Sequence, residues 1–403
     1  MNLYKKYKKT ISLLLIIFTI LPFFLIMSTS VVSASLDLKE IEENHPWLKG
    51  VLLMIVTFII NKFAGDDNPG SGSSSNKDTE DSPVIIENHQ EDINREVLGF
   101  HVNWLTPEAN SYEALRDNWK NINMVAPFWY TVKPDGEIET RYGGYQYEVD
   151  SFSRNRNIKV LPLINNSQEN NMMLVDPEIR RKAVNNIVDM VEKYDFAGVN
   201  IDFEFIPPWT RNGYTSFIKD LSVKLRKINK MITISVFPKI DVPLELQGAY
   251  DYAALAPLVD RMVIMTYDNH WSRGPAGPIA PINWVEDNIR YALEYLPESK
   301  LLLGIANYGY DWAGGFGQDL SSKKAIELAA EKGAEVNWHD TFQTPYFYYW
   351  ENEKKHEVWF ENAKSLASKL DLVEKYNLKG IAIWRLGNAT DKFWETIESR
   401  LKK

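Results

Sequence analysis

Two carboxylic acids and an amide alternate with apolar residues in segment 198–205. In an extended strand, Asn200, Asp202 and Glu204 point to one face and the apolar side chains to the other. The two acids then lie roughly 6–7 Å apart, at a rise of about 3.3 Å per residue. Acids this close raise one another's pKa, which suits one of them to donate a proton near neutral pH. An ordinary edge strand with a solvated face is the alternative reading.

Short apolar runs alternate with helical periods from residue 95 onward, and they supply the elements that must position these acids. We predict eight strands, at 97–102, 122–126, 158–164, 198–204, 232–236, 262–265, 301–305 and 380–383. Helices are predicted between them, at 111–119, 177–194, 214–229, 284–295 and 360–376. Eight buried strands alternating with helices predict an α/β fold, a closed (β/α)8 TIM barrel. A doubly wound open sheet is the alternative, but it usually needs fewer strands and a glycine-rich first turn.

Polar or aromatic residues follow nearly every predicted strand. In a barrel these strand ends meet at one mouth, where reacting groups lie. They predict a lined groove formed by Trp104, Trp129, Asn165, Glu204, Tyr267, Asp268, Asn307, Tyr308, Trp384 and Arg385. Between strands seven and eight, residues of about 313–360 predict a small α+β insertion that carries a hairpin. Its aromatic run, 346–350, is interpreted mainly as packing, with sugar contacts as the alternative.

Composition excludes several classes of function. The net charge of −9 argues against a nucleic-acid partner, which requires a basic face. The chain has no cysteine, so thiolate sites and disulfides are impossible. The six histidines show no paired metal-ligand spacing and no phosphate-binding glycine loop occurs, so we expect neither a metal nor a cofactor.

The N-terminal part of the chain predicts export. Lysines precede an apolar run at 11–27 and small residues end at Ala34, so residues 1–34 are interpreted as a signal peptide or a membrane anchor. Residues 35–64 form a short apolar or amphipathic segment, and 1–64 together predict membrane association. Residues 65–90 are a flexible linker, rich in Gly and Ser. We expect a secreted or cell-surface protein of a Gram-positive type of bacterium, with its catalytic domain at 91–403.

Four motifs in order resemble glycoside hydrolase family 18. Segment 198–204 resembles the family's strand-four signature D-G-x-D-x-D-x-E, and 265–268 resembles its strand-six M-x-Y-D. Segment 304–309 has the form G-x-x-x-Y-G, and 380–384 has the form G-x-x-x-W. The likeness covers roughly residues 95–400, and within the family it is greatest to the bacterial branch of spore-cortex and cell-wall glycosylases.

The resemblance implies substrate-assisted hydrolysis, in which the acetamido group of an N-acetylhexosamine polysaccharide is the nucleophile. It implies Glu204 as the acid and base, Asp202 as the partner of the acetamido nitrogen, and Tyr267 as the partner of the acetamido oxygen. Asn200 would bond to Asp202, and Trp384 would form the floor beneath the reacting sugar. The remaining substrate contacts implied at the strand ends are Asp268, Trp104, Trp129, Asn307, Tyr308 and Arg385.

Two positions depart from the signature, since Ala197 and Asn200 stand where the family has aspartates. Fewer like charges then lie behind Asp202, which predicts an altered pH dependence rather than a loss of activity. The leading hypothesis is a retaining hydrolase of a cell-wall glycan, either peptidoglycan or spore cortex. The alternatives are a chitinase or endo-β-N-acetylglucosaminidase acting on other glycans, and a barrel that binds glycan without cutting it.

Overall fold

Eight parallel strands close into a barrel in the computed structural model, which describes residues 95–103, 111–167 and 171–401. The closure pairs the first strand with both the second and the last, since Leu98 lies opposite Met124 and also opposite Ala382. The barrel strands are β1 (Glu96–His101), β2 (Met124–Val132), β5 (Leu163–Asn166), β6 (Gly198–Asp202), β7 (Met231–Val236), β8 (Arg261–Ile264), β9 (Leu301–Ala306) and β15 (Gly380–Trp384). The predicted TIM barrel is confirmed, and each predicted strand overlaps one of these.

Alternating side chains along the strands build two separate apolar layers. On β1, Leu98 and Phe100 belong to a cluster inside the barrel, whereas Val97 belongs to the large cluster between strands and helices. The same alternation on β6 places Val199 and Ile201 in that outer layer, fully buried. The face of β6 that points inward is therefore left for Asn200 and Asp202, as the alternation predicts.

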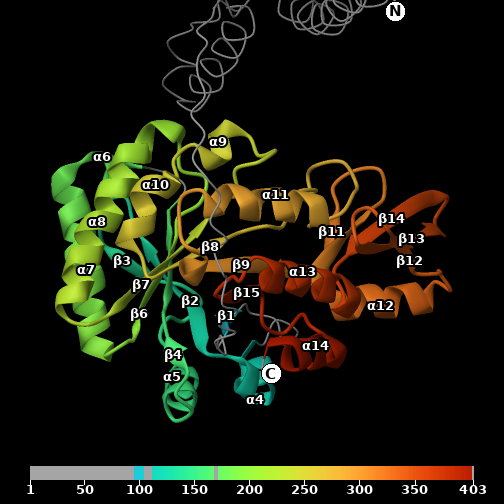
Figure 1. Cartoon of the computed structure of the whole chain (residues 1–403), viewed down its shortest axis with the longest axis horizontal. Coiled ribbons are helices and arrows are strands. Elements are labelled where there is room, and N and C mark those ends of the chain that lie inside the picture. Colours follow the sequence, from blue (N-terminus) through green and yellow to red (C-terminus); the bar gives the residue numbers. More distant parts are fainter. Residues whose placement is uncertain (1–94, 104–110, 168–170, 402–403) are drawn as a thin grey trace, which may run out of the picture. The chain divides into compact units, whose positions relative to one another are not determined.

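Helices cover the outside of the barrel (Figure 1). They are α4 (Ser111–Asp117), α5 (Tyr147–Arg154), α6 (Met172–Val175), α7 (Pro177–Tyr194), α8 (Arg211–Lys227), α9 (Leu244–Gln247), α10 (Tyr252–Leu255), α11 (Ile282–Leu293), α13 (Ala363–Lys375) and α14 (Asp391–Leu401), with 3-10 turns at Trp119–Asn121, Pro208–Thr210, Ala256–Leu258 and Glu298–Lys300. Helix α7 begins as predicted, because Asp176 accepts hydrogen bonds from the backbone N–H groups of Glu178 and Ile179, and Pro177 occupies the first turn.

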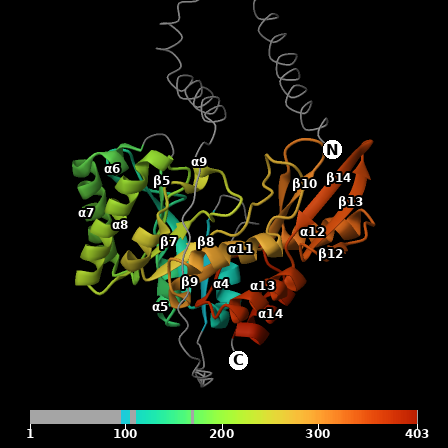
Figure 2. The same cartoon turned by 45° about the horizontal axis from the view of Figure 1, so that its top comes forward.

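A second sheet lies beside the barrel, on the side opposite α7 and α8 (Figures 1 and 2). Its five antiparallel strands, in spatial order, are β11 (Gln318–Ser321), β10 (Tyr308–Trp312), β14 (Lys354–Phe360), β13 (Thr344–Glu351) and β12 (Asn337–His339). Helix α12 (Ser322–Glu331) packs Ala325 and Ala329 against Phe347 and Phe360 on one face of this sheet. The predicted insertion is therefore present, but it begins at β10, earlier than residue 313.

Two short pieces complete the sheet of the barrel and refine the predicted strands. Strand β3 (Ile138–Thr140) runs antiparallel to β2, and β4 (Lys159–Val160) pairs with β2 ahead of β5, so the predicted strand 158–164 is interrupted. Strand β6 ends at Asp202, two residues before the predicted end, which leaves Glu204 in the loop beyond it. Phe205 does not continue the alternation: its φ is +54° and its side chain is 52% exposed.

The predicted leader, apolar segment and linker, residues 1–90, lie outside the described residues, as does Trp104. Within 95–103, 111–167 and 171–401, no helix combines the length and the apolar character that crossing a membrane requires.

Candidate active site

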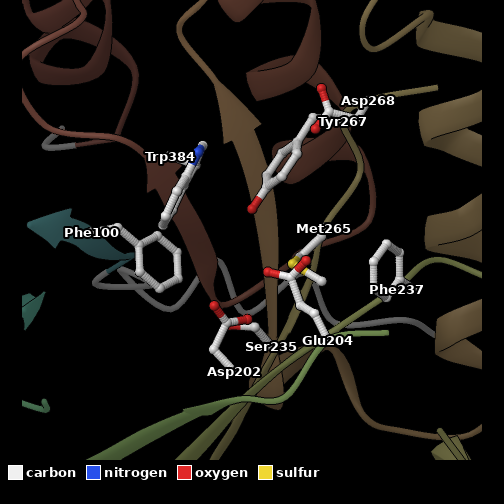
Figure 3. A pocket seen from close by; sticks show the side chains of 9 residues that line it. All are labelled: Phe100, Asp202, Glu204, Ser235, Phe237, Met265, Tyr267, Asp268 and Trp384. Carbon is white, nitrogen blue, oxygen red and sulfur yellow. The ribbon is translucent and has the colours of Figure 1, made fainter. Parts of the chain in front are cut away.

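Asp202 and Glu204 line one cavity of about 200 Å³ at the carboxyl ends of the barrel strands. Figure 3 shows Tyr267 and Trp384 across this cavity from the two acids, with the Tyr267 hydroxyl pointing into it. The full set of lining residues is Phe100, Asp202, Glu204, Ser235, Phe237, Met265, Tyr267, Asp268 and Trp384. The barrel thus brings together side chains from five strand ends that are far apart in the sequence.

Backbone hydrogen bonds fix the loop that carries Glu204. The amide side chain of Asn166, at the end of β5, accepts from Glu204 N at 2.8 Å and donates to Glu204 O at 3.0 Å. One residue earlier, the hydroxyl of the buried Tyr250 donates to Phe203 O at 2.6 Å. Because both polar groups of the Glu204 backbone are held by one neighbouring strand, its carboxyl group has a defined position although it lies beyond β6.

A short polar network lies behind Asp202. Asn200, which is fully buried, donates to Thr233 Oγ1 at 2.9 Å and accepts from Ser235 Oγ at 3.2 Å. The Ser235 hydroxyl is also a hydrogen-bond partner of the Asp202 carboxyl group. A hydroxyl has one proton, so Ser235 donates either to Asn200 or to the Asp202 carboxylate, and not to both at once. Ser235 therefore connects Asn200 and Asp202, which were expected to bond directly.

Burial dominates the protonation of the two acids. It raises the pKa of Asp202 to about 7, and the hydrogen bond from Ser235 opposes this rise. Burial also raises the pKa of Glu204 well above its usual value, and the negative charges of Asp202 and Asp268 add to that rise. Burial and these charges therefore favour the protonated form of Glu204, which is the form that a general acid requires. The Oδ1 atom of Asp202 is buried and has no hydrogen-bond partner among the described residues, so it can accept one from a ligand.

Tyr267 lies three residues beyond β8, and its ring packs closely against Gly304 on the neighbouring strand β9. A Cβ on Gly304 would lie 3.1 Å from Cε1 of the Tyr267 ring and 2.5 Å from the Ile264 carbonyl oxygen. Burial raises the pKa of Tyr267 well above its usual value, and Asp202 and Glu204 add to the rise. Its hydroxyl therefore stays protonated and acts as a hydrogen-bond donor.

Asp268 follows Tyr267 in the left-handed backbone region, with φ of +59°. Its Oδ1 accepts hydrogen bonds from the hydroxyls of Tyr308, at 2.7 Å, and Tyr310, at 2.9 Å. In Figure 3 this carboxylate points away from Asp202 and Glu204. Asp268 thus lines the cavity, as predicted, while Tyr308 is buried and anchors Asp268 instead of lining the cavity.

Trp384 ends β15 and packs edge-on against Phe100, with ring centroids 5.5 Å apart. The next residue, Arg385, donates its N–H to Asn307 Oδ1 at 3.0 Å, and its carbonyl oxygen accepts from Asn307 Nδ2 at 2.8 Å. Asn307 is fully buried, so it positions the Trp384–Arg385 junction. Arg385 itself is half-buried beside the tryptophan, and its contact with substrate stays a prediction.

Three predicted substrate contacts are corrected by burial. Trp129 is 1% exposed, lies in the outer apolar layer and donates its indole N–H to Gln146 Oε1 at 3.2 Å. Asn200 and Asn307 are fully buried and bond to neighbouring strands. These side chains hold the site together but do not reach a ligand. The sequence placed them at strand ends, but a strand end alone does not reveal whether a side chain faces the mouth or the helices.

Several functional residues were missed by the sequence. Ser235, Phe237 and Met265 line the cavity, and Asn166 holds the backbone of Glu204. Asn166 is next to Asn165, which the sequence did single out, and a strand ending in two asparagines was the available signal. Ser235 had no signal, since an alternating serine in a buried strand is common.

No group of three or more acidic or histidine side chains within the described part of the chain is arranged to hold a metal ion. The cavity is lined by acidic side chains, a tyrosine and other aromatic side chains. Their arrangement allows proton transfer at one point of the cavity and hydrogen bonding to an amide at another.

Known proteins share this arrangement of strands. The model of the glycosyl hydrolases family 18 matches residues 53–389. The cortical fragment-lytic enzyme of Bacillus subtilis is 32% identical over 260 residues, covering 60% of this chain and 60% of that enzyme. The chain therefore spans less than two thirds of that relative's length.

Solved structures agree with this assignment. The spore cortex-lytic enzyme SleL of Bacillus megaterium superposes with a TM-score of 0.70 at 27% identity, over 77% of this chain and 75% of that one. A chitinase from Chromobacterium violaceum superposes with a TM-score of 0.71 at 29% identity, over 77% of this chain and 99% of that one. Because the family model spans most of the chain, and the barrel and its acids are in the expected order, the protein belongs to family 18 of the glycosyl hydrolases.

Proposed function

We propose that the chain is a retaining glycoside hydrolase that cleaves β-linked N-acetylhexosamine bonds in a cell-wall glycan, peptidoglycan or spore cortex. The observation that carries this proposal is that Glu204, Asp202, Tyr267 and Trp384 line one cavity. Similarity to the cortical fragment-lytic enzyme and to SleL supports a wall glycan as the substrate.

The proposed reaction uses the acetamido group of the substrate as nucleophile. Glu204, whose protonated form is favoured by burial, gives its proton to the leaving glycosidic oxygen while the acetamido oxygen attacks the anomeric carbon. Tyr267 donates a hydrogen bond to that oxygen and positions it for attack. Asp202 accepts from the acetamido N–H and stabilises the positive charge of the oxazolinium ring. Glu204, now a carboxylate, then removes a proton from the water that opens the ring, with net retention.

Release of reducing ends from purified peptidoglycan and spore cortex tests this proposal. We expect hydrolysis that N-acetylglucosamine thiazoline inhibits, because that compound mimics the oxazoline ring. Glu204→Gln should lower kcat by about 10²–10⁴, the usual contribution of a general acid. With an aryl glycoside whose leaving group needs no proton, Glu204→Gln should reduce the rate of the first step much less.

The exposed Glu245→Gln serves as the matched control and should leave the rate unchanged. Full activity in Glu204→Gln would refute the proposed role. Tight glycan binding without any product would favour a barrel that only binds, which is the alternative function. That alternative is less favoured here because both acids and the tyrosine are present in the cavity.

Chitin is the second candidate substrate. The superposition with the Chromobacterium violaceum chitinase covers nearly all of that enzyme, and the reaction chemistry is the same. Parallel digestion of chitin oligosaccharides and of wall sacculi, with identification of the new reducing end, distinguishes the two. A higher kcat/KM on chitin oligosaccharides than on sacculi would reverse the order of the candidates.

We also propose that the protein acts outside the cytoplasmic membrane, attached to it or secreted. The support is the basic and apolar pattern of residues 1–34 together with a substrate found in the wall. Fractionation of cells that express the full chain tests this, and recovery in the cytoplasm alone would contradict it.

A further inference from the structure

A second cavity, of about 310 Å³, lies against the sheet of the insertion. Its walls are two loop segments, 274–276 and 314–315, together with Trp312, Lys355 and Glu357. We call it the insertion pocket. None of these residues lines the cavity that holds Glu204, so the two are separate sites.

The insertion pocket lies on the face of the second sheet that continues toward the barrel mouth. Residues directly opposite one another in an antiparallel pair share a face, and Glu357 lies opposite both Trp312 and Tyr348. Ring contacts then connect Trp312 to Tyr310 at 5.4 Å, Tyr310 to Tyr308 at 5.7 Å and Tyr308 to Tyr267 at 6.3 Å. The insertion pocket and the catalytic cavity are therefore neighbours along one aromatic wall.

One cationic and one anionic side chain, Lys355 and Glu357, line the insertion pocket. Within the described part of the chain, neither forms an ion pair. The Lys355 ammonium lies 3.9 Å from the ring centroid of Tyr348, where the ring face attracts it but satisfies none of its N–H groups. Glu357 Oε1 accepts from the indole N–H of Trp359 at 2.8 Å, which orients its carboxylate. A cation and an anion held apart in one pocket complement a ligand that carries both signs.

Further features of the insertion pocket suit a peptide. The ring of Trp312 forms an apolar wall of the insertion pocket, and its Nε1 edge faces Gly317, where an added Cβ would lie 2.7 Å from that atom. A Cβ on Gly314 or Gly315 would meet nothing within 4 Å, so that rim is open. Two exposed aromatic residues add apolar surface. Phe316, 76% exposed, follows Gly315 in the chain, and Trp350, 70% exposed, lies opposite Lys355 on the paired strand.

We propose that the insertion pocket binds the peptide stem of a peptidoglycan strand whose sugar backbone occupies the catalytic cavity. A stem peptide carries free carboxylates, amides and, where it contains a diamino acid, a free amine. Its carboxylate pairs with Lys355 and its amine or amide with Glu357. This inference rests on the proposed function. A neutral sugar could hydrogen-bond these groups but brings no opposite charge, so it would offset the desolvation of Lys355 and Glu357 less well than a peptide that carries both signs.

The test compares two substrates with the same glycan, one with its stem peptides and one from which an amidase has removed them. Full-length wild type should show a kcat/KM ratio in favour of the peptide-bearing strands of about fivefold or more, since each exposed charge contact contributes up to about fivefold. Lys355→Gln and Glu357→Gln should each lower that ratio by up to about fivefold, mainly through KM, without changing kcat on bare strands, and the double variant should bring it close to one. Lys354→Gln, an exposed neighbour on the same strand, should keep the wild-type ratio.

Equal rates of wild type on both substrates would overturn the inference, and so would a ratio that survives both substitutions. Variants that lose activity equally on bare strands would indicate a sugar subsite, which also overturns it. If no glycan is cleaved at all, the proposed function fails, but the insertion pocket is still tested. Calorimetric binding of a disaccharide tetrapeptide to Glu204→Gln must then exceed that of the bare disaccharide, and adding Lys355→Gln and Glu357→Gln together must abolish the difference. Unchanged circular dichroism and Tm exclude misfolding in each variant.

Discussion

Asp202→Asn should stabilise the protein at alkaline pH and do so much less at acidic pH. The wild-type carboxyl group is buried, and its pKa rises from 3.8 to about 7 on folding. A group whose pKa is higher in the folded state contributes its full stability below its unfolded pKa and loses it as pH rises through the folded value. The loss due to Asp202 therefore occurs between about pH 4 and pH 7. Asparagine does not ionise, so the Asp202→Asn variant does not lose stability in this pH range through position 202.

The size of the effect follows from the rise in pKa. One pKa unit corresponds to about 1.4 kcal/mol, so a rise of about three corresponds to about 4 kcal/mol. Asp202 and Glu204 share one cavity and titrate as a pair, so the variant also relieves Glu204 of a neighbouring charge. Both contributions have the same sign. The free energy of unfolding of Asp202→Asn minus that of wild type should thus increase by up to about 4 kcal/mol from pH 4 to pH 8.

Urea unfolding followed by tryptophan fluorescence at a series of pH values measures this difference. The exposed Asp117→Asn is the control and should differ from wild type by less than about 0.5 kcal/mol throughout. The double variant Asp202→Asn/Glu204→Gln should show the weakest pH dependence of the set. A difference between Asp202→Asn and wild type that is constant from pH 4 to pH 8 would refute the reasoning that burial sets this pKa.

Three further outcomes follow from the contacts of the site and the core. Asn166→Ala removes both hydrogen bonds that hold the backbone of Glu204, and it should lower kcat about tenfold or more while KM and Tm change little; an unchanged kcat would contradict this positioning role. Asn200→Asp adds a buried carboxylate behind the catalytic pair and should move both limbs of the kcat/KM profile to higher pH, and a profile that stays in place would contradict this. Lys369→Met leaves its buried ion-pair partner Glu361 uncompensated and should cost about 3–5 kcal/mol in urea unfolding, whereas a cost below about 1 kcal/mol would be inconsistent with that burial.

Periodicity in the sequence was sufficient to predict the barrel. Eight apolar strands in a regular series leave few topologies, and the alternation in β6 located Asn200 and Asp202 on the inward face. Glu204 lies in the loop beyond β6 and lines the same cavity as Asp202. Helices α6, α9 and α10 were missed because each spans four residues, too few for a clear helical period. Helices α5 and α14 were also missed, although the seven-residue α4 was predicted. In the second sheet, β10 was not predicted, because the insertion was expected to begin only at about residue 313, whereas β10 follows β9 after a single residue.

The site was predicted less completely, because strand ends do not reveal which way a side chain points. Trp129 and Asn307 have the residue types of sugar contacts, yet one packs against the helices and the other holds a backbone junction. The same limit hid Asn166, whose value lies in two hydrogen bonds to a residue 38 positions away. Contacts between distant segments of this kind depend on the closed barrel and leave no local pattern in the sequence.

The network behind Asp202 shows what the departure at position 200 of the family signature does to the site. With asparagine at position 200, the residue behind Asp202 is neutral and is held by Thr233 and Ser235. Burial therefore dominates the pKa of Asp202, and burial together with the charges of Asp202 and Asp268 raises the pKa of Glu204. The burial that keeps Glu204 protonated for catalysis is the same burial that makes ionised Asp202 costly to the fold. Substitutions that stabilise the protein at this position should therefore impair the reaction. Stability and activity are opposed here through one carboxyl group, and the large apolar layers of the barrel offset its cost.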